Sequence, residues 1–311
     1  SMKQTLAITR KELSSYFGSP MALIFVGVFL VATLFVFFWV DAFFARGIAD
    51  VRSLFRWMPV LLIFLVATLT MRQWSEEQRS GTLEVLLTLP VRSIQLVAGK
   101  FLATLALVAL ALALTLFVPI TVALLGNMDW GPVVGGYVAA MLLAAAYTAI
   151  GLFMSSRTDN QIVALISTAA LCGLLYVVGT SGVTDFAGAG LTEVLRAIGS
   201  GSRFDSIERG VIDLRDLVYY LTLTGVFLAL NVLSLESKHW SAGAATRLRR
   251  SGAVLTTALV VLNLVLLNVW MYPLNRLRLD LTADREYTLS RTTRDLLSNL
   301  QEPLQISGYF S

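Results

Sequence analysis

Charged residues are scarce in this sequence, and cysteine and histidine occur only once each. Charged residues make up 14% of the 311 residues, whereas overall protein usage is about 25%. The single cysteine, Cys172, excludes a disulfide within the chain, and its apolar surroundings predict a small buried hydrophobe. The single histidine, His239, has no Cys or Glu cluster beside it, so we interpret it as an interfacial side chain and predict no metal site.

Other absences exclude several classes of function. The His-Glu-x-x-His motif of a metalloprotease needs two histidines, and the chain has one. That histidine lies outside the apolar stretches, so it cannot form the membrane-embedded Ser–His pair of an intramembrane protease. A phosphate-binding loop is missing, because Gly99 and Lys100 are followed by Phe101 rather than Ser or Thr. No basic stripe interleaved with aromatics accompanies the net charge of +4, which argues against nucleic acid as a partner. We therefore predict that the chain is not an enzyme and holds no cofactor of its own.

Apolar residues are in large excess. They make up 56% of the chain, and the mean hydropathy is +0.74, so membrane lipid is the expected solvent. About 20 apolar residues cross a bilayer, and six of the seven charge-free stretches reach that length. The second stretch has only 15 residues, which leaves a re-entrant segment as an alternative to a span. The stretches are 20–40, 57–71, 101–125, 130–156, 160–184, 217–235 and 251–275. The predicted fold class is an all-α polytopic membrane protein.

The predicted spans contain no charged residue. Proton pumps, ion-coupled carriers and voltage sensors need ionisable groups at depth, so these classes are disfavoured. The polar exceptions are amides, which commonly join helices to one another. They are Asn160, Gln161, Asn231, Asn263 and Asn268.

The N-terminal residues 3–17 have the pattern of a helix that lies in the membrane surface. Leu6, Leu13 and Phe17 fall near one face, and most charged residues fall elsewhere. Lysine and arginine divide equally between the two sides of the membrane, so the positive-inside rule does not orient the chain. The basic cluster at 247–250 abuts a span and favours a cytoplasmic N-terminus.

The segment 72–90, between the second and third spans, is the most distinctive part of the chain. Glu76 and Arg79 are spaced to pair across one helical turn. Gly81 can end that turn, and Thr82 can cap a second short helix. That helix has an apolar face and is stopped by Pro90. The face consists of Leu83, Leu86 and Leu87. Pattern alone leaves an ordinary solvated loop equally open.

Residues 76–90 (EEQRSGTLEVLLTLP), followed by Gly99 and Lys100, resemble the coupling-helix region of ABC type-2 permeases. The resemblance covers 3–240 and includes GLFMSS at 151–156. It implies a six-span permease unit over 2–240 that pairs as a homodimer, with an ABC ATPase subunit docked on 72–90. ATP would then bind the partner subunit. The residues implied in coupling are Glu76, Glu77, Arg79, Gly81, Thr82, Leu83 and Glu84.

A second resemblance concerns the remainder of the chain. Residues 204–220 (FDSIERGVIDLRDLVYY) and 234–240 (SLESKHW) are similar to the gliding-motility-associated permeases (GldF-like). Residues 277–290 (LRLDLTADREYTLS) and 302–306 (EPLQI) resemble the start of their partner, the GldG-like protein. The resemblance implies a fusion of the two through a cytoplasmic linker at 241–250 and a seventh span at 251–275. It also implies the start of an extracytoplasmic α/β domain at 276–311, in a multi-pass protein of the bacterial inner membrane.

The connections carry three further expectations. Residues 41–56 are expected to form an amphipathic helix, and the resemblance implies partial helices in the outer loop 185–216. Residues 289–300 have helical spacing with Ser290 or Thr292 as cap, and 304–310 alternates like a strand.

The functional prediction is the membrane subunit of an ATP-driven ABC transporter, which couples hydrolysis on a separate ATPase to export or conformational change. One alternative is a complex that transmits force or signal to the extracytoplasmic domain and moves no substrate. A second is a membrane scaffold without an ATPase.

Overall fold

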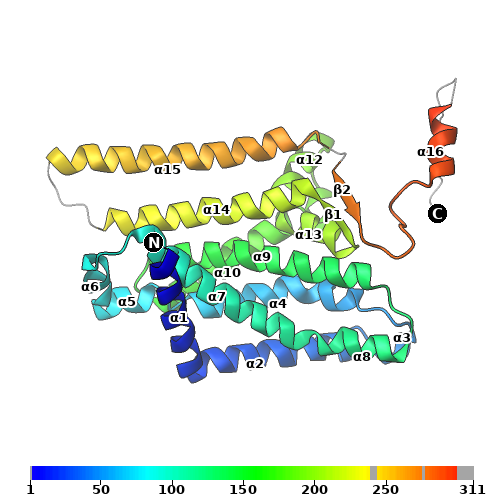
Figure 1. Ribbon diagram of the computed structural model, residues 1–311, viewed down its shortest axis with the longest axis horizontal. Coiled ribbons are helices and arrows are strands. Elements are labelled where there is room, and N and C mark those ends of the chain that lie inside the picture. Colours follow the sequence, from blue (N-terminus) through cyan, green and yellow to red (C-terminus); the bar gives the residue numbers. More distant parts are fainter. Residues whose placement is uncertain (1, 239–243, 275–276, 300–311) are drawn as a thin grey trace.

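The computed structural model describes residues 2–238, 244–274 and 277–299. Most of this part of the chain forms long helices that lie side by side, with a short helix, α1, lying across one end of them (Figure 1). The elements are α1 (Met2–Gly18), α2 (Pro20–Phe35), the π-helical turn η1 (Val36–Val40), α3 (Phe43–Arg46), α4 (Arg52–Thr70), α5 (Ser75–Ser80), α6 (Thr82–Thr88), α7 (Ser93–Thr115), α8 (Phe117–Leu125), α9 (Trp130–Ser156), α10 (Gln161–Val178), α11 (Ser181–Thr184), α12 (Ala189–Ile198), α13 (Ser200–Glu208), β1 (Val211–Asp213), α14 (Leu214–Ser237), α15 (Ala244–Met271), β2 (Arg278–Asp280) and α16 (Arg291–Ser298).

Seven helical segments of the described chain are long and apolar enough to cross a membrane, as predicted. They are formed by α2 with η1, α4 with its extension towards α5, α7 with α8, α9, α10, α14 and α15. The protein is therefore an all-α polytopic membrane protein. We call the end where α1, α5 and α6 lie the α1 end, and the end where the strands lie the sheet end (Figure 1).

The second span is longer than its charge-free stretch. Helix α4 runs for 19 residues and contains Pro59. It packs against α2, α9 and α10, and Arg52 and Arg56 lie exposed near its beginning. A span is therefore favoured over the re-entrant alternative, because the chain continues as one helix past two arginines that can reach the membrane surface.

The helices also continue past the charge-free stretches elsewhere, so charged residues enter the helices near their ends. Helix α7 begins at Ser93 and includes Lys100, whose side chain is buried. Helix α14 includes Arg215 and Asp216 in its first turn. Each of these charges has an ion-pair partner, which offsets the cost of removing it from water.

Close helix packing at the centre depends on small residues of α9. A Cβ at Gly151 would lie 2.1 Å from the Thr70 Oγ1, and one at Gly136 would lie 2.6 Å from the Phe55 ring. Glycine therefore lets α9 and α4 approach closely, as small residues do between membrane helices. A second, smaller cluster of buried apolar residues lies at the α1 end. We call it the end cluster, and it consists of Trp74, Leu83, Leu96, Val97, Leu152 and Leu235.

A short sheet joins the segment before α14 to the segment after α15. Strands β1 and β2 are antiparallel, with Ile212 opposite Leu279. Gly210 has a φ of 88°, which favours glycine, and its carbonyl oxygen accepts a hydrogen bond from the Leu281 N–H. Because α14 and α15 pack against each other, the beginning of α14 and the end of α15 lie close together at this sheet.

The predicted connections are confirmed in part. The single helix expected over 41–56 is wrong, because Ala42 and Gly47 adopt positive φ and leave only the four-residue α3 between them. The outer loop 185–216 does contain two partial helices, α12 and α13. The helix predicted over residues 3–17 is present as α1, in which Leu6 and Phe17 are exposed.

At the C-terminal side one prediction needs correction, one is confirmed, and one lies outside the described residues. The linker expected over 241–250 is helical from Ala244 onward as the beginning of α15, and 241–243, with His239, lie outside the described residues. Helix α16 confirms the cap at Ser290, whose Oγ accepts a hydrogen bond from the Thr293 N–H. The strand expected at 304–310 also lies outside the described residues.

Candidate functional site

The predicted coupling segment forms two short helices, α5 and α6, at the α1 end. Gly81 links them with a φ of 73° and ends α5. Gly81 is also the cap of α6, so the prediction that Thr82 caps this helix is wrong: Thr82 is its first residue. The Thr82 hydroxyl instead pairs with the Ser80 hydroxyl at 2.9 Å across the turn. Helix α6 ends at Thr88, before Pro90 as predicted.

The predicted ion pair within α5 has a different partner. Glu76 accepts two hydrogen bonds from the Arg72 guanidinium at 2.8 and 3.0 Å. Arg79 acts on Glu76 only through its charge. Arg79, three residues after Glu76, and Arg72, four residues before it, are both at helical neighbour spacing. The chain uses Arg72, the arginine on the N-terminal side.

The seven predicted coupling residues divide into two groups. Leu83 is buried in the end cluster, and Glu77 points inward and is 21% exposed at its side chain. The other five are exposed at the α1 end, as is Val85, whose exposed fraction is 66%. They are Glu76, Arg79, Gly81, Thr82 and Glu84.

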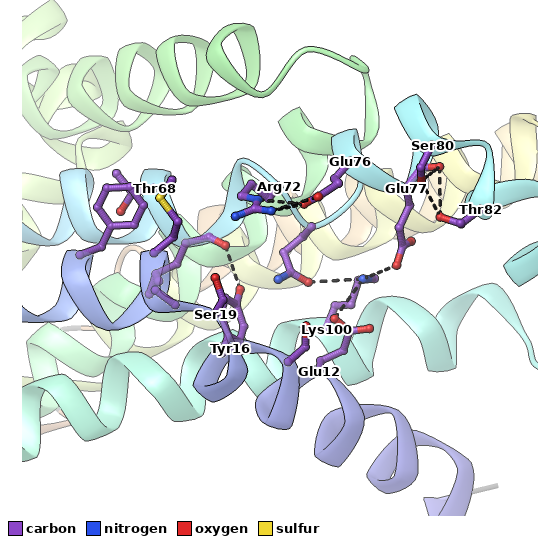
Figure 2. Close-up of a pocket in the computed structure, with 16 residues that line it drawn as sticks. Glu12, Tyr16, Ser19, Thr68, Arg72, Glu76, Glu77, Ser80, Thr82 and Lys100 are labelled. Carbon is purple, nitrogen blue, oxygen red and sulfur yellow. Dashed lines mark hydrogen bonds and ion pairs between the residues drawn. The ribbon is translucent and has the colours of Figure 1, made fainter.

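Lys100 lies at the centre of the inward side. Its Nζ is 3.0 Å from Glu77 Oε1 and 3.2 Å from Glu12 Oε2, and its side chain is 2% exposed (Figure 2). The same ammonium is 3.4 Å from the Gln73 amide oxygen and lies over the Trp74 ring at 4.8 Å. Because Glu12 belongs to α1, Glu77 to α5 and Lys100 to α7, one buried cation joins three helices. We call these three residues the Lys100 triad.

A cleft of about 310 Å³ opens beside the Lys100 triad. Its walls come from α1, α2, α4, α5 and α7 (Figure 2). The Tyr16 hydroxyl lies on one side, donates to the Leu69 carbonyl at 2.8 Å and pairs with the Thr104 hydroxyl at 2.9 Å. Burial raises the pKa of Tyr16 well above its usual value, so this phenol stays neutral and ties α1 to α4 and α7.

A second set of bonds fixes the segment to α9. The backbone N–H groups of Trp74 and Ser75 donate to the Ser155 Oγ at 3.0 and 3.1 Å. The Ser155 hydroxyl donates to the Met71 carbonyl at 3.1 Å. One buried serine thereby satisfies three backbone groups where the chain turns from α4 into α5.

Gln78 extends this attachment to α14. Its Nε2 lies 3.2 Å from the carbonyl oxygens of Ser155 and Ser156 and 3.3 Å from that of Thr158. Its Oε1 accepts from the Lys238 Nζ at 2.9 Å. Burial, and then the charge of Arg157, lower the pKa of Lys238. The amide joins the carboxyl ends of α9 and α14 to α5.

Sequence reasoning missed four of the residues that position this segment: Glu12, Gln78, Lys100 and Ser155. The first three are polar residues in amphipathic or boundary positions, where a solvated side chain is the ordinary expectation. Lys100 directly precedes the charge-free stretch 101–125, where a lysine is expected to mark the end of a span. A signal existed in Ser155, since a hydroxyl at the end of an apolar run faces neighbouring backbone groups more often than lipid.

Within the described residues, no group of three or more His, Cys, Asp or Glu side chains is placed to hold a metal ion. The arrangement is mechanical: α5 and α6 present exposed polar side chains, and inward bonds hold α5 to α7, to α9 and to the end of α14.

Comparison with known protein families gives a match. The family model described as ABC-2 family transporter protein matches residues 30–269, which extends from the first span into the seventh. No curated protein matches the sequence.

Proposed function

The chain belongs to the ABC-2 transporter family and is a permease-type membrane component of an ABC transporter; from this premise we propose that α5 and α6 are where a separate ABC ATPase docks. ATP would bind and be hydrolysed on that partner. The permease would work as a homodimer in the bacterial inner membrane, with its N-terminus and the α1 end in the cytoplasm.

The observation that carries this proposal is the division of the segment into an exposed and an anchored side. Arg79, Glu84 and Val85 of the two short helices are all exposed, and such a mixture of charged and apolar side chains suits a protein partner. The anchored side reaches α7 through Lys100 and α9 through Ser155. A displacement of α5 by the ATPase would therefore move several membrane helices at once.

The finer assignments follow from the sequence resemblance. We propose that 2–240 is the six-span permease unit, that 251–275 is a tethering span, and that 276–311 begins an extracytoplasmic α/β domain of the GldG-like kind. A gliding-motility-associated (GldF-like) role is the corresponding biological proposal. The pairing of β1 with β2 supports an arrangement in which 185–216 and 276–299 share one side of the membrane.

The test is co-purification of the full chain with the ABC-class ATPases of the same cell, followed by measurement of ATPase stimulation. Only exposed residues should be changed, because replacing the buried Leu83 would disturb the fold. We expect Arg79→Glu with Val85→Asp to abolish both binding and stimulation. Arg209→Glu, an exposed change at the sheet end, is the matched control and should leave both intact. Unaltered binding by the double variant would refute the docking assignment.

A second candidate function is transmission of force or signal without transport. It is favoured by the sheet, and by the Asp129 carboxylate, which accepts from the Gly131 N–H and from the Ala283 N–H. These contacts connect the segment after α15 to the beginning of α9. Spin labels at Leu125→Cys and Leu279→Cys would report whether ATP turnover changes their separation. A change in separation without ATP-dependent uptake of solute by vesicles favours this candidate, and an unchanged separation contradicts it.

A further inference from the structure

Two adjoining cavities lie near the sheet end, away from α5 and α6. The first has a volume of about 660 Å³ and is lined by α10, α12, α14 and α15. The second has a volume of about 460 Å³ and is lined mainly by α12, α13 and the beginning of α14. They share five lining residues and therefore adjoin each other. The shared residues are Glu193, Ala197, Arg203, Asn268 and Tyr272.

The first cavity is an apolar groove between membrane helices. Leu223 and Val226 of α14 face Leu264 and Val265 of α15 across it, and Leu175 of α10 closes another side. These residues belong to segments that cross the membrane. A groove in this position is open to hydrocarbon, so an acyl chain fits its walls.

The second cavity is polar and carries an excess of positive charge. Three arginines and two carboxylates line it: Arg196, Arg203, Arg215, Glu193 and Asp216. Arg203 pairs with Asp216 at 3.0 Å and stacks on the Tyr219 ring at 4.4 Å. Arg215 pairs at 2.7 Å with Asp213 outside the cavity. Arg203 and Arg215 therefore already have ion-pair partners within the protein.

Arg196 differs from the other two arginines. It is exposed, and among the residues that the structure describes its guanidinium has no ion pair or hydrogen bond. A guanidinium presents a planar fork of donors that matches two oxygens of a phosphate. Glu193, one turn earlier on α12, is held by the Tyr272 hydroxyl. Arg196 is thus the cation that remains available to a ligand.

Polar groups mark the boundary between the two cavities. The Asn268 Nδ2 donates to the Thr222 Oγ1 at 2.6 Å and to the Leu264 carbonyl at 2.9 Å. Its amide oxygen is left to accept a further bond. An amide at the junction of an apolar groove and a charged basin suits the ester region of an amphiphile, where the hydrocarbon ends and the headgroup begins.

We propose that the two cavities form one binding site for an anionic phospholipid from the membrane leaflet at the sheet end. Its acyl chain lies in the groove between α14 and α15, and its phosphate binds Arg196. This lipid joins the seventh helix to the six-helix unit and is distinct from any cargo moved through the ATPase-driven cycle. The inference goes beyond the proposed function and does not depend on it.

Charge selects an anionic lipid over a zwitterionic one. Three arginines line the basin against two carboxylates. Asp213, which pairs with Arg215 from outside the lining, is offset by Arg278 at 3.7 Å, so one positive charge remains, which the single negative charge of phosphatidylglycerol would neutralise. Phosphatidylethanolamine would bring an ammonium group into a basin that already holds the excess cation. A free phosphate would use Arg196 but leave the groove without an occupant.

The experiment uses the full chain in nanodiscs that contain equal amounts of phosphatidylglycerol and phosphatidylethanolamine. The protein is released from the nanodiscs in the spectrometer, and bound lipid is identified by native mass spectrometry. We expect retention of one phosphatidylglycerol molecule in preference to phosphatidylethanolamine. We expect Arg196→Glu to reduce that retention about tenfold, the effect of losing one charge-assisted pair. Arg291→Glu makes the same charge change on exposed α16 and should have no effect.

A second variant tests the groove. Val226→Trp would fill the space between α14 and α15 and should displace both lipids, whereas Arg196→Lys keeps the charge and should retain most of the binding. Equal retention of the two lipids by the wild-type protein overturns the proposal, because it shows an apolar groove without headgroup selection. Equal retention by the wild type and Arg196→Glu overturns the assignment of the phosphate to Arg196. Displacement by inorganic phosphate alone would show an anion site rather than a lipid site.

Discussion

The ammonium of Lys100 lies 3.0 Å from the carboxylate of Glu77, and both side chains are largely withdrawn from solvent. The pair connects a membrane helix, α7, with the segment proposed to receive the ATPase. Removing one member of a buried ion pair leaves the other charge without compensation, which costs more than the pair itself contributes.

Replacement of Lys100 should therefore be strongly destabilising. We expect Lys100→Ala to lower the free energy of unfolding by about 3–5 kcal/mol, because Glu77 loses its ion-pair partner and Glu12 keeps only the exposed Lys11. Unfolding in detergent titrated with denaturant measures the effect. Lys11 lies 3.8 Å from the same Glu12 but is 69% exposed, so Lys11→Ala should change stability by less than about 0.5 kcal/mol. Equal losses for the two lysines would contradict this account.

A neutral version of the Lys100 triad provides a further check. The combination Lys100→Met, Glu12→Gln and Glu77→Gln removes all three charges and should recover much of the stability that Lys100→Ala loses. Failure to recover would mean that the lysine acts through packing rather than through charge.

Ser155 should control the order of α5 rather than the stability of the whole bundle. In Ser155→Ala, the backbone N–H groups of Trp74 and Ser75 lose their acceptor, at a cost of about 1–3 kcal/mol. We expect faster hydrogen exchange of amides 72–80 with unchanged exchange in the central part of α9. Ser167→Ala is the control, because the Ser167 hydroxyl bonds only to carbonyls of its own helix. Equal hydrogen exchange of amides 72–80 in Ser155→Ala and Ser167→Ala would contradict the role of Ser155.

Gly131 should determine whether the segment after α15 stays docked at the sheet end. A Cβ at this position would lie 2.2 Å from the Leu281 carbonyl oxygen and 2.9 Å from the Thr282 Cα. The contact is with backbone, so Gly131→Ala must displace the segment. The cysteine pair Ile212→Cys and Leu279→Cys, placed at opposed strand positions, should form a disulfide readily in the parent and poorly with Gly131→Ala. Gly173→Ala, which meets no atom within 4 Å, should not alter the yield.

Glu208 should make the protein less stable as the pH rises. Burial and the neighbouring charge of Asp205 raise the pKa of Glu208 to about 7, against the opposing charges of Arg209, Arg52 and Arg56. The folded state therefore holds a proton that the unfolded state has lost, and stability falls as the pH increases from the ordinary range of a glutamate through about 7.

The measurement is the melting temperature of the purified protein between pH 5.5 and 8. Glu208→Gln should flatten the decline, since the amide stays neutral throughout. Glu286→Gln, at an exposed position, should follow the wild-type curve. If the melting temperature of Glu208→Gln declined with pH as in the wild type, the decline would belong to another titrating group.

The seven spans were predictable because each needs only a local property, an apolar run long enough to cross a bilayer. The same reasoning placed the helix α16 and its Ser290 cap, and the stop of α6 before Pro90. These features depend on residues close together in the sequence. The exact helix ends did not follow, because charged residues such as Lys100 are admitted to a helix when a distant partner compensates them.

The coupling segment shows the same division. Spacing offered two short helices with an apolar face at Leu83 but left a solvated loop equally open. It did not give the partner of Glu76, since Arg72 and Arg79 are both within one turn of that residue. The Lys100 triad brings together positions 12, 77 and 100, and the contacts of Gln78 reach position 238. The strands β1 and β2 have three residues each, too few for a period-two pattern to be read.

Helix α15 spans the membrane, yet none of its described residues belongs to either of the two hydrophobic clusters. The described helices before α15 therefore complete both clusters without it. In genetic terms, the junction between α14 and α15 is a place where two reading frames can be joined or separated without rebuilding an interior. Recombination at that point would exchange α15 and whatever follows it and leave both clusters unchanged.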